Sequence, residues 1–70
     1  MRPKYPELEA EFCLSGPDGN AFVILSRVSV LLEEGGHGDE VDVFRDEATS
    51  GDYEDLKACV ERWISVEFYE

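Results

Sequence analysis

The chain has 70 residues, and its 17 Asp and Glu side chains against six Lys and Arg give a formal net charge of -11. This length makes a single domain, and no apolar run approaches the roughly 18 residues that a membrane-spanning helix needs. Direct nucleic-acid binding is disfavoured because phosphates repel so acidic a chain, and an apolar fraction of 43% argues against wholesale disorder.

Most of this charge belongs to the second half of the chain. Residues 1–32 hold four acids and three bases, a net charge of -1, whereas residues 33–70 hold thirteen acids and three bases, a net charge of -10. Two interpretations stay open. The acids form a solvated surface that keeps the protein in solution, or they form a surface built to meet a basic partner.

The N-terminal region predicts a short arm followed by a strand. Residues 1–6 contain two prolines and no periodicity, which is typical of a flexible arm, and no apolar run follows them, so we expect no signal peptide. Residues 7–15 then alternate, with Leu8, Ala10 and Phe12 on one face and acids on the other. This period of two predicts a half-buried strand.

Turn residues 16–19 lead into the first of three predicted helices. Asn20 is a favourable N-cap, the apolar period becomes helical from Ala21, and Gly35-Gly36 ends the pattern.

Two shorter helices and a second strand follow. Asp39 can cap the second helix, and Ser50 or Asp52 can cap the third. Residues 64–68 alternate again, which predicts a strand that ends the domain.

The predicted fold is therefore α+β with the order βαααβ. A single domain over residues 7–70 packs three helices on a two-stranded sheet formed by the N- and C-terminal strands. Antiparallel pairing is favoured because antiparallel pairs are the commoner kind. Both edges of such a sheet are exposed, which leaves a homodimer open.

The sequence offers little catalytic or metal-binding chemistry. His37 is the single histidine and lies in a glycine-rich segment, where a general base is poorly held. Cys13 and Cys59 do not form a zinc-binding spacing, and we expect free thiols in a reducing cytoplasm. Carboxylates beside Cys13 disfavour the thiolate. We expect no catalytic residue, no metal and no cofactor.

Two anion-binding patterns also fail on charge. Residues 16–19 precede a helix N-terminus, but Asp18 opposes a phosphate there. The helices around residues 49–51 have a helix-turn-helix outline, but the second helix begins with acids where a DNA-reading helix carries Lys or Arg.

The acids of the second and third helices form the predicted binding surface. A helix rises about 1.5 Å per residue and duplex DNA carries one charge per about 1.7 Å, so an acidic helical face approaches the charge density of DNA. We expect a basic protein surface as partner, with Phe22, Tyr53 and Tyr69 as candidate aromatic anchors. The predicted contact residues are Asp39, Glu40, Asp42, Asp46, Glu47, Asp52, Tyr53, Glu54 and Asp55.

Two segments resemble a group of small uncharacterised bacterial and phage proteins. They are DGNAFVIL at residues 18–25 and EATSGDY at residues 47–53, and the similarity extends over roughly residues 7–68. It implies a short protein of phage or mobile-element type and brings no functional residue with it. The acid-rich residues 33–46 depart from the group, whose middle segment is more balanced in charge.

Small acidic phage proteins often block CRISPR or restriction systems by occupying DNA-binding surfaces, so the resemblance implies, by analogy, a non-enzymatic inhibitor in the cytoplasm. The alternative is a structural or accessory homo-oligomer in which the acids have no binding role. A small enzyme or metal protein is the third possibility.

Overall fold

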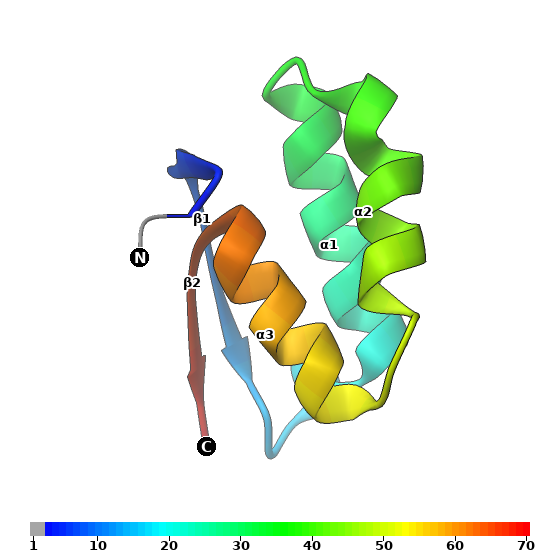
Figure 1. The fold of residues 1–70 in the computed structure, drawn as a ribbon. Helices are drawn as coiled ribbons and strands as arrows, with labels where there is room; N and C mark the ends of the chain where they lie inside the picture. Colours follow the sequence, from blue (N-terminus) through cyan, green and yellow to red (C-terminus); the bar gives the residue numbers. More distant parts are fainter. Residues whose placement is uncertain (1–2) are drawn as a thin grey trace.

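Along the chain, three helices lie between an N-terminal and a C-terminal strand, in the order that the sequence predicts, and the two strands lie side by side in one sheet (Figure 1). The computed structural model describes residues 3–70. Short 3₁₀ turns, η1 and η2, precede the first two helices. The elements are β1 (Tyr5–Cys13), η1 (Pro17–Gly19), α1 (Ala21–Glu34), η2 (Gly38–Glu40), α2 (Val41–Ala48), α3 (Tyr53–Trp63) and β2 (Ile64–Tyr69).

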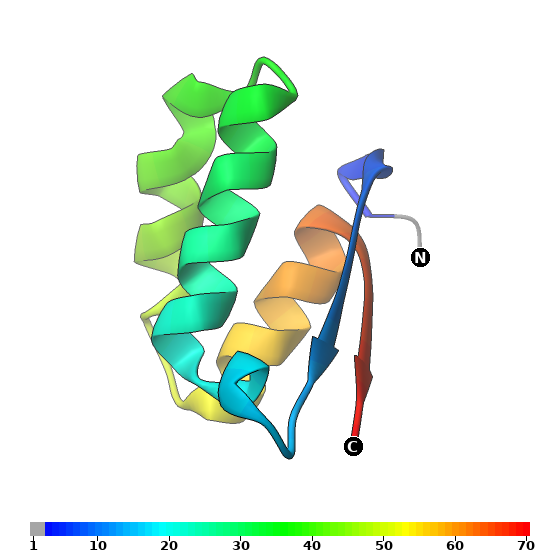
Figure 2. The ribbon, with the colours of Figure 1, turned by 180° about the vertical axis from the view of Figure 1, so that it is seen from behind.

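The two strands run parallel, so the predicted antiparallel pairing is wrong. Ala10 lies opposite Val66, and Phe12 lies opposite Phe68. The chain reverses at each of the four junctions that link the two strands and the α-helices in order, so β2 runs in the direction of β1 (Figures 1 and 2). Antiparallel pairs are commoner overall, and many of them are strands joined by a hairpin. Parallel strands need a longer crossover connection, which in this chain contains the three helices.

The sheet begins two residues earlier than the alternation predicts. The Lys4 amide donates to the Arg62 carbonyl at 2.8 Å, and the Tyr5 ring stacks on His37 with 3.7 Å between the ring centroids. Lys4 and Tyr5, at the end of the predicted arm, are therefore part of the fold. Residues 1–2 of that arm lie outside the described residues.

Side-chain caps start the first and third helices. The Asn20 side chain accepts from the Phe22 amide at 2.8 Å, as its position predicts. Of the two candidate caps for α3, Asp52 is the one used, and it forms a reciprocal capping box with Asp55. Asp39, the predicted cap of the second helix, instead lies within η2, because the chain makes a 3₁₀ turn before α2 begins.

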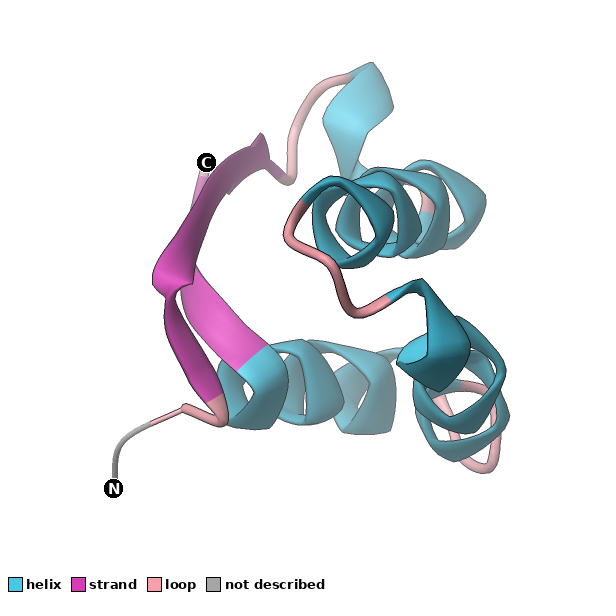
Figure 3. Cartoon of the chain, turned by 90° about the horizontal axis from the view of Figure 1, so that it is seen from above, coloured by secondary structure: helices cyan, strands magenta, loops and turns pink. Residues whose placement is uncertain are grey.

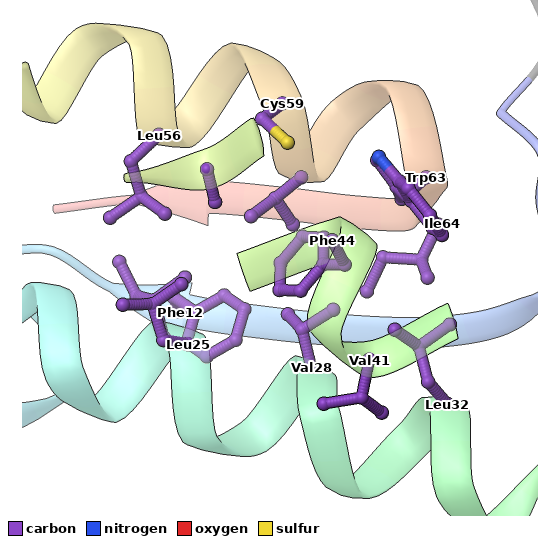
Figure 4. Close-up of a cluster of buried hydrophobic side chains, with 13 residues drawn as sticks. Phe12, Leu25, Val28, Leu32, Val41, Phe44, Leu56, Cys59, Trp63 and Ile64 are labelled. Carbon is purple, nitrogen blue, oxygen red and sulfur yellow. The ribbon is translucent and has the colours of Figure 1, made fainter. Parts of the chain in front are cut away.

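The core lies between the inner face of the sheet and the helices (Figures 3 and 4). α1 and α3 contact the sheet, and α2 packs on both of these helices. The rings of Phe44 and Trp63 meet edge to face, with 5.5 Å between their centroids. The largest of the fully buried side chains around them are Phe12, Ile24, Val28, Leu32, Val60 and Ile64.

The two segments that carry the resemblance meet in space. A Cβ at Gly19 would lie 2.3 Å from the Leu14 carbonyl oxygen, so the backbones approach too closely there for any other residue. The Tyr53 hydroxyl donates to the Gly19 carbonyl and ties the start of α3 to η1. Both segments therefore have a structural role in turns and helix caps.

Replacement of Tyr53 by Phe tests this link. The variant loses the hydroxyl donor to Gly19 and should lower the free energy of unfolding by about 1 kcal/mol. Tyr69→Phe is the matched control, since that ring is 49% exposed. Urea unfolding measures both. An equal effect of the two replacements would contradict a stabilising bond at Gly19.

Candidate functional site

The nine predicted contact residues fall into two groups that follow one another along the chain. One group lies along η2 and α2, and the other lies at the start of α3 (Figure 1). The structure therefore places the two groups on successive helices, with Glu47 of the first group in the last turn of α2 and Asp52 at the start of α3. The first group is Asp39, Glu40, Asp42, Asp46 and Glu47, and the second is Asp52, Tyr53, Glu54 and Asp55.

The second group has partners within the molecule. In the capping box the Asp52 carboxylate accepts a hydrogen bond from the Asp55 amide at 3.0 Å, and the Asp55 carboxylate accepts one from the Asp52 amide at 3.2 Å. Glu54 pairs with the Lys57 ammonium at 3.1 Å, and that ammonium lies 5.1 Å from the centroid of the Tyr53 ring. These side chains begin α3 and stabilise its first turn.

Glu47 joins α2 to α3. Its Oε1 accepts from the Arg62 guanidinium at 3.0 Å, from the Trp63 indole at 3.4 Å and from the Cys59 thiol at 3.5 Å. The hydrogen bond from Arg62 is the main reason that the pKa of Glu47 is lowered. A buried indole needs an acceptor for its N–H, and Glu47 supplies it.

Glu40 also has an internal partner. It pairs with the Lys4 ammonium at 2.6 Å and so connects η2 to the start of β1. The same ammonium lies 4.6 Å from the centroid of the Trp63 ring. The exposed acids Asp39, Asp42 and Asp46 remain.

These three carboxylates lie in one row. Their spacings of three and four residues put them on one exposed face of η2 and α2, and none of them has an ion pair within residues 3–70. The end of α1 contacts η2 and adds two exposed acids. We name these five residues the helical acidic surface: Glu33, Glu34, Asp39, Asp42 and Asp46.

A second acidic surface covers the outer face of the sheet. Glu9 and Glu11 are exposed on β1, and Glu67 lies directly opposite Glu11 in the parallel register. No ion pair joins these three residues to another part of the described chain. We name Glu9, Glu11 and Glu67 the sheet acidic surface.

Sequence reasoning missed this second surface. The near-neutral net charge of residues 1–32 concealed it, because two bases offset the strand acids in that sum although they pair with acids outside the strand. Arg27 binds Asp18 at 3.1 Å, and Lys4 binds Glu40. The alternation of residues 7–15 was the available signal, since it already set the acids of that strand on its polar face.

Two hollows meet at the outer edge of β1. The first, of about 400 Å³, lies between β1 and α1, and the second, of about 790 Å³, extends across to β2. They share Glu9, Ala10, Glu11 and Arg27. The first is also lined by Ser26, Val30 and Leu31, and the second by Ser65, Val66 and Glu67.

The three candidate aromatic anchors have different environments. Phe22 is 76% exposed on α1, in one row with Ser26 and Val30 at spacings of four residues. Tyr69 is half-exposed at the end of β2. Tyr53 is half-buried and hydrogen-bonded to the η1 turn, so it is a structural residue.

Comparisons of the chain with protein-family models, curated proteins and solved structures found no match. Over residues 3–70, no three His, Cys, Asp or Glu side chains gather as metal ligands would. None of the helices in this range is both long and apolar enough to cross a membrane. The two acidic surfaces and the hollows beside β1 are the candidate binding features of residues 3–70.

A pH titration tests the role of Glu47. Because its folded-state pKa is lowered from 4.5, the pair contributes stability above that pH and loses it as the pH falls through the folded pKa. The side chain is 40% exposed, so water screens the pair and the contribution is below about 1 kcal/mol. Glu47→Gln should therefore flatten the decline in stability below pH 4.5, as followed by urea unfolding.

Asp46→Asn is the control for this titration, because Asp46 has no ion pair in the described part of the chain. It should leave the acid-induced decline steeper than in the Glu47 variant. Equal slopes in the two variants would show that Glu47 has no special role.

The two cysteines should differ in reactivity. Both are free thiols, but Cys59 is buried, and its burial and the charge of Glu47 raise its pKa to about 11. Cys13 is only half-buried. At pH 8 a disulfide reagent should modify Cys13 in the folded protein and Cys59 only after unfolding. Modification of folded Cys13→Ser protein at the unfolded rate would contradict this burial.

Proposed function

We propose that the protein is a non-enzymatic inhibitor that binds the basic surface of a nucleic-acid-binding protein. The observation that carries the proposal is the exposed row of Asp39, Asp42 and Asp46, which has no ion pair within the described residues. Glu40 and Glu47, their neighbours in sequence, do have partners. Like charges at helical spacing repel one another, and a basic partner removes that repulsion.

The spacing of the row supports competition with nucleic acid. At a rise of about 1.5 Å per residue, the three carboxylates span about 10 Å of helix axis. Successive carboxylates are then about 5 Å apart along the axis, against about 3.4 Å per phosphate along one strand of duplex DNA. A groove lined with Lys and Arg for phosphates can bind such a row.

The sequence resemblance directs the proposal toward host defence. Proteins of phage or mobile-element type meet CRISPR and restriction nucleases, whose DNA-binding channels are basic. The proposed partner is therefore a nuclease of this kind, and the proposed action is to occupy the channel in place of DNA.

Reversal of two charges tests the binding surface. Immobilised protein should retain a basic protein from a nuclease-treated bacterial lysate at low salt, and Asp42→Lys with Asp46→Lys should abolish that retention. The control is Glu61→Lys with Glu70→Lys, which changes the net charge equally outside both acidic surfaces. Equal retention by the two double variants would contradict the proposed surface.

A competition experiment tests the mode of inhibition. Addition of the protein should release labelled duplex DNA from the purified partner, and the rate of association should fall with added salt because opposite charges attract the two proteins. A stable complex of protein, partner and DNA together would contradict competition for the DNA-binding surface.

The alternative function, a structural homo-oligomer, is favoured by exposed apolar side chains. Phe22 on α1 and Val43 on α2 are 76% and 57% exposed. Sedimentation equilibrium separates the two candidates. A dimer that persists at low salt and retains no basic protein would support the alternative, and a monomer would support the proposal above.

A further inference from the structure

The outer edge of β1 has unpaired backbone groups. At the end of the ladder the Leu14 amide donates to the Tyr69 carbonyl at 2.6 Å. Successive residues of a strand direct their backbone N–H and C=O groups to opposite edges. The backbone groups of Phe12 therefore face β2, like the Leu14 amide, and the backbone groups of Glu9 and Glu11 point to the outer edge. The sheet formed by residues 3–70 has two strands only, so no further strand pairs with this edge.

Different surfaces flank this edge on its two sides. On the helical side, the hollow of about 400 Å³ between β1 and α1 is lined by Ala10, by Leu31 and by Val30, which is 50% exposed. On the outer side lies the sheet acidic surface. A strand added here would have one face against apolar side chains and the other beside carboxylates.

We propose that the outer edge of β1 binds an extended segment of a partner protein in which apolar and basic side chains alternate. Its backbone pairs with Glu9 and Glu11, its apolar side chains enter the hollow beside α1, and its Lys or Arg side chains meet the sheet acidic surface. Strand addition of this kind obtains affinity from main-chain hydrogen bonds and specificity from alternate side chains. Like the proposed function, this docking involves a basic partner protein. It does not require the helical acidic surface.

A second copy of the chain fits this edge poorly. Two copies of β1 paired side by side would bring Glu9 and Glu11 of one copy close to the same acids of the other, and like charges on adjacent strands are destabilising. Arg27 is the base that lines the hollow, and Asp18 already binds it at 3.1 Å. A segment that carries Lys or Arg is therefore the occupant whose charge complements Glu9 and Glu11 at this edge.

Peptide titration with detection by NMR tests the docking edge. The probe is a seven-residue peptide that alternates Val and Lys, and the matched control alternates Val and Glu. With saturating Lys peptide at low salt, hydrogen exchange at the Glu9 and Glu11 amides should slow by about tenfold or more. Absence of protection at these two amides, or equal protection by the Glu peptide, would overturn the inference.

Two replacements of Glu11 separate hydrogen bonding from charge. Glu11→Pro removes an outward amide without removing a bond to β2, and Glu11→Gln removes only the charge. The Pro variant should lose the peptide, and the Gln variant should bind it with less dependence on salt. Retained binding by a Pro variant that is folded by circular dichroism would overturn strand addition.

A charge-reversal pair keeps the test decisive if the Pro variant does not fold. Glu9→Lys with Glu11→Lys should lose the Lys peptide and gain the Glu peptide, and an unchanged preference would overturn the inference. Asp42→Lys with Asp46→Lys should still bind the Lys peptide at β1. Loss of peptide binding in that variant alone would assign the peptide to the helical acidic surface and reject docking at the edge.

Discussion

The parallel pairing of β1 with β2 is the constraint on which the rest of the structure depends. It brings the two ends of the chain together after four reversals, and it sets Ala10 opposite Val66 and Phe12 opposite Phe68 on the inner face. That face covers α1 and α3. The same register sets Glu11 opposite Glu67 on the outer face, so the arrangement that closes the core also creates the sheet acidic surface.

The sequence predicts the elements of this fold better than their pairing. Alternation, helical apolar stripes and the caps at Asn20 and Asp52 are local signals, and each is confirmed. The strand direction follows from a reversal of the chain at each junction, and the junction of Trp63 with Ile64 has no turn residue that would mark such a reversal in the sequence. The prediction of antiparallel pairing rested on the frequency of such pairs alone, and it is wrong.

The binding surface was less predictable because ion pairs connect residues far apart in the chain. The Glu40 pair with Lys4 and the Glu47 pair with Arg62 span 36 and 15 residues, and no local pattern marks them. The capping role of Asp55 could have been foreseen from its position three residues after Asp52. What distinguishes the proposed contact acids is therefore their lack of internal partners in the described chain, which only the structure can give.

We propose that the acids without ion pairs in the described chain serve binding and do not hold the fold together. Simultaneous neutralisation of Asp46 to Asn and of Glu9, Glu11 and Glu67 to Gln tests it most directly, with thermal unfolding as the measurement. Asp39 and Asp42 are kept, because acids in the first turn of a helix stabilise that turn. Because repulsion between like charges decreases, the melting temperature should stay constant or rise. A decrease of more than about 5 °C, which corresponds to about 1 kcal/mol in a domain of this size, would show that these acids stabilise the fold and would contradict the account.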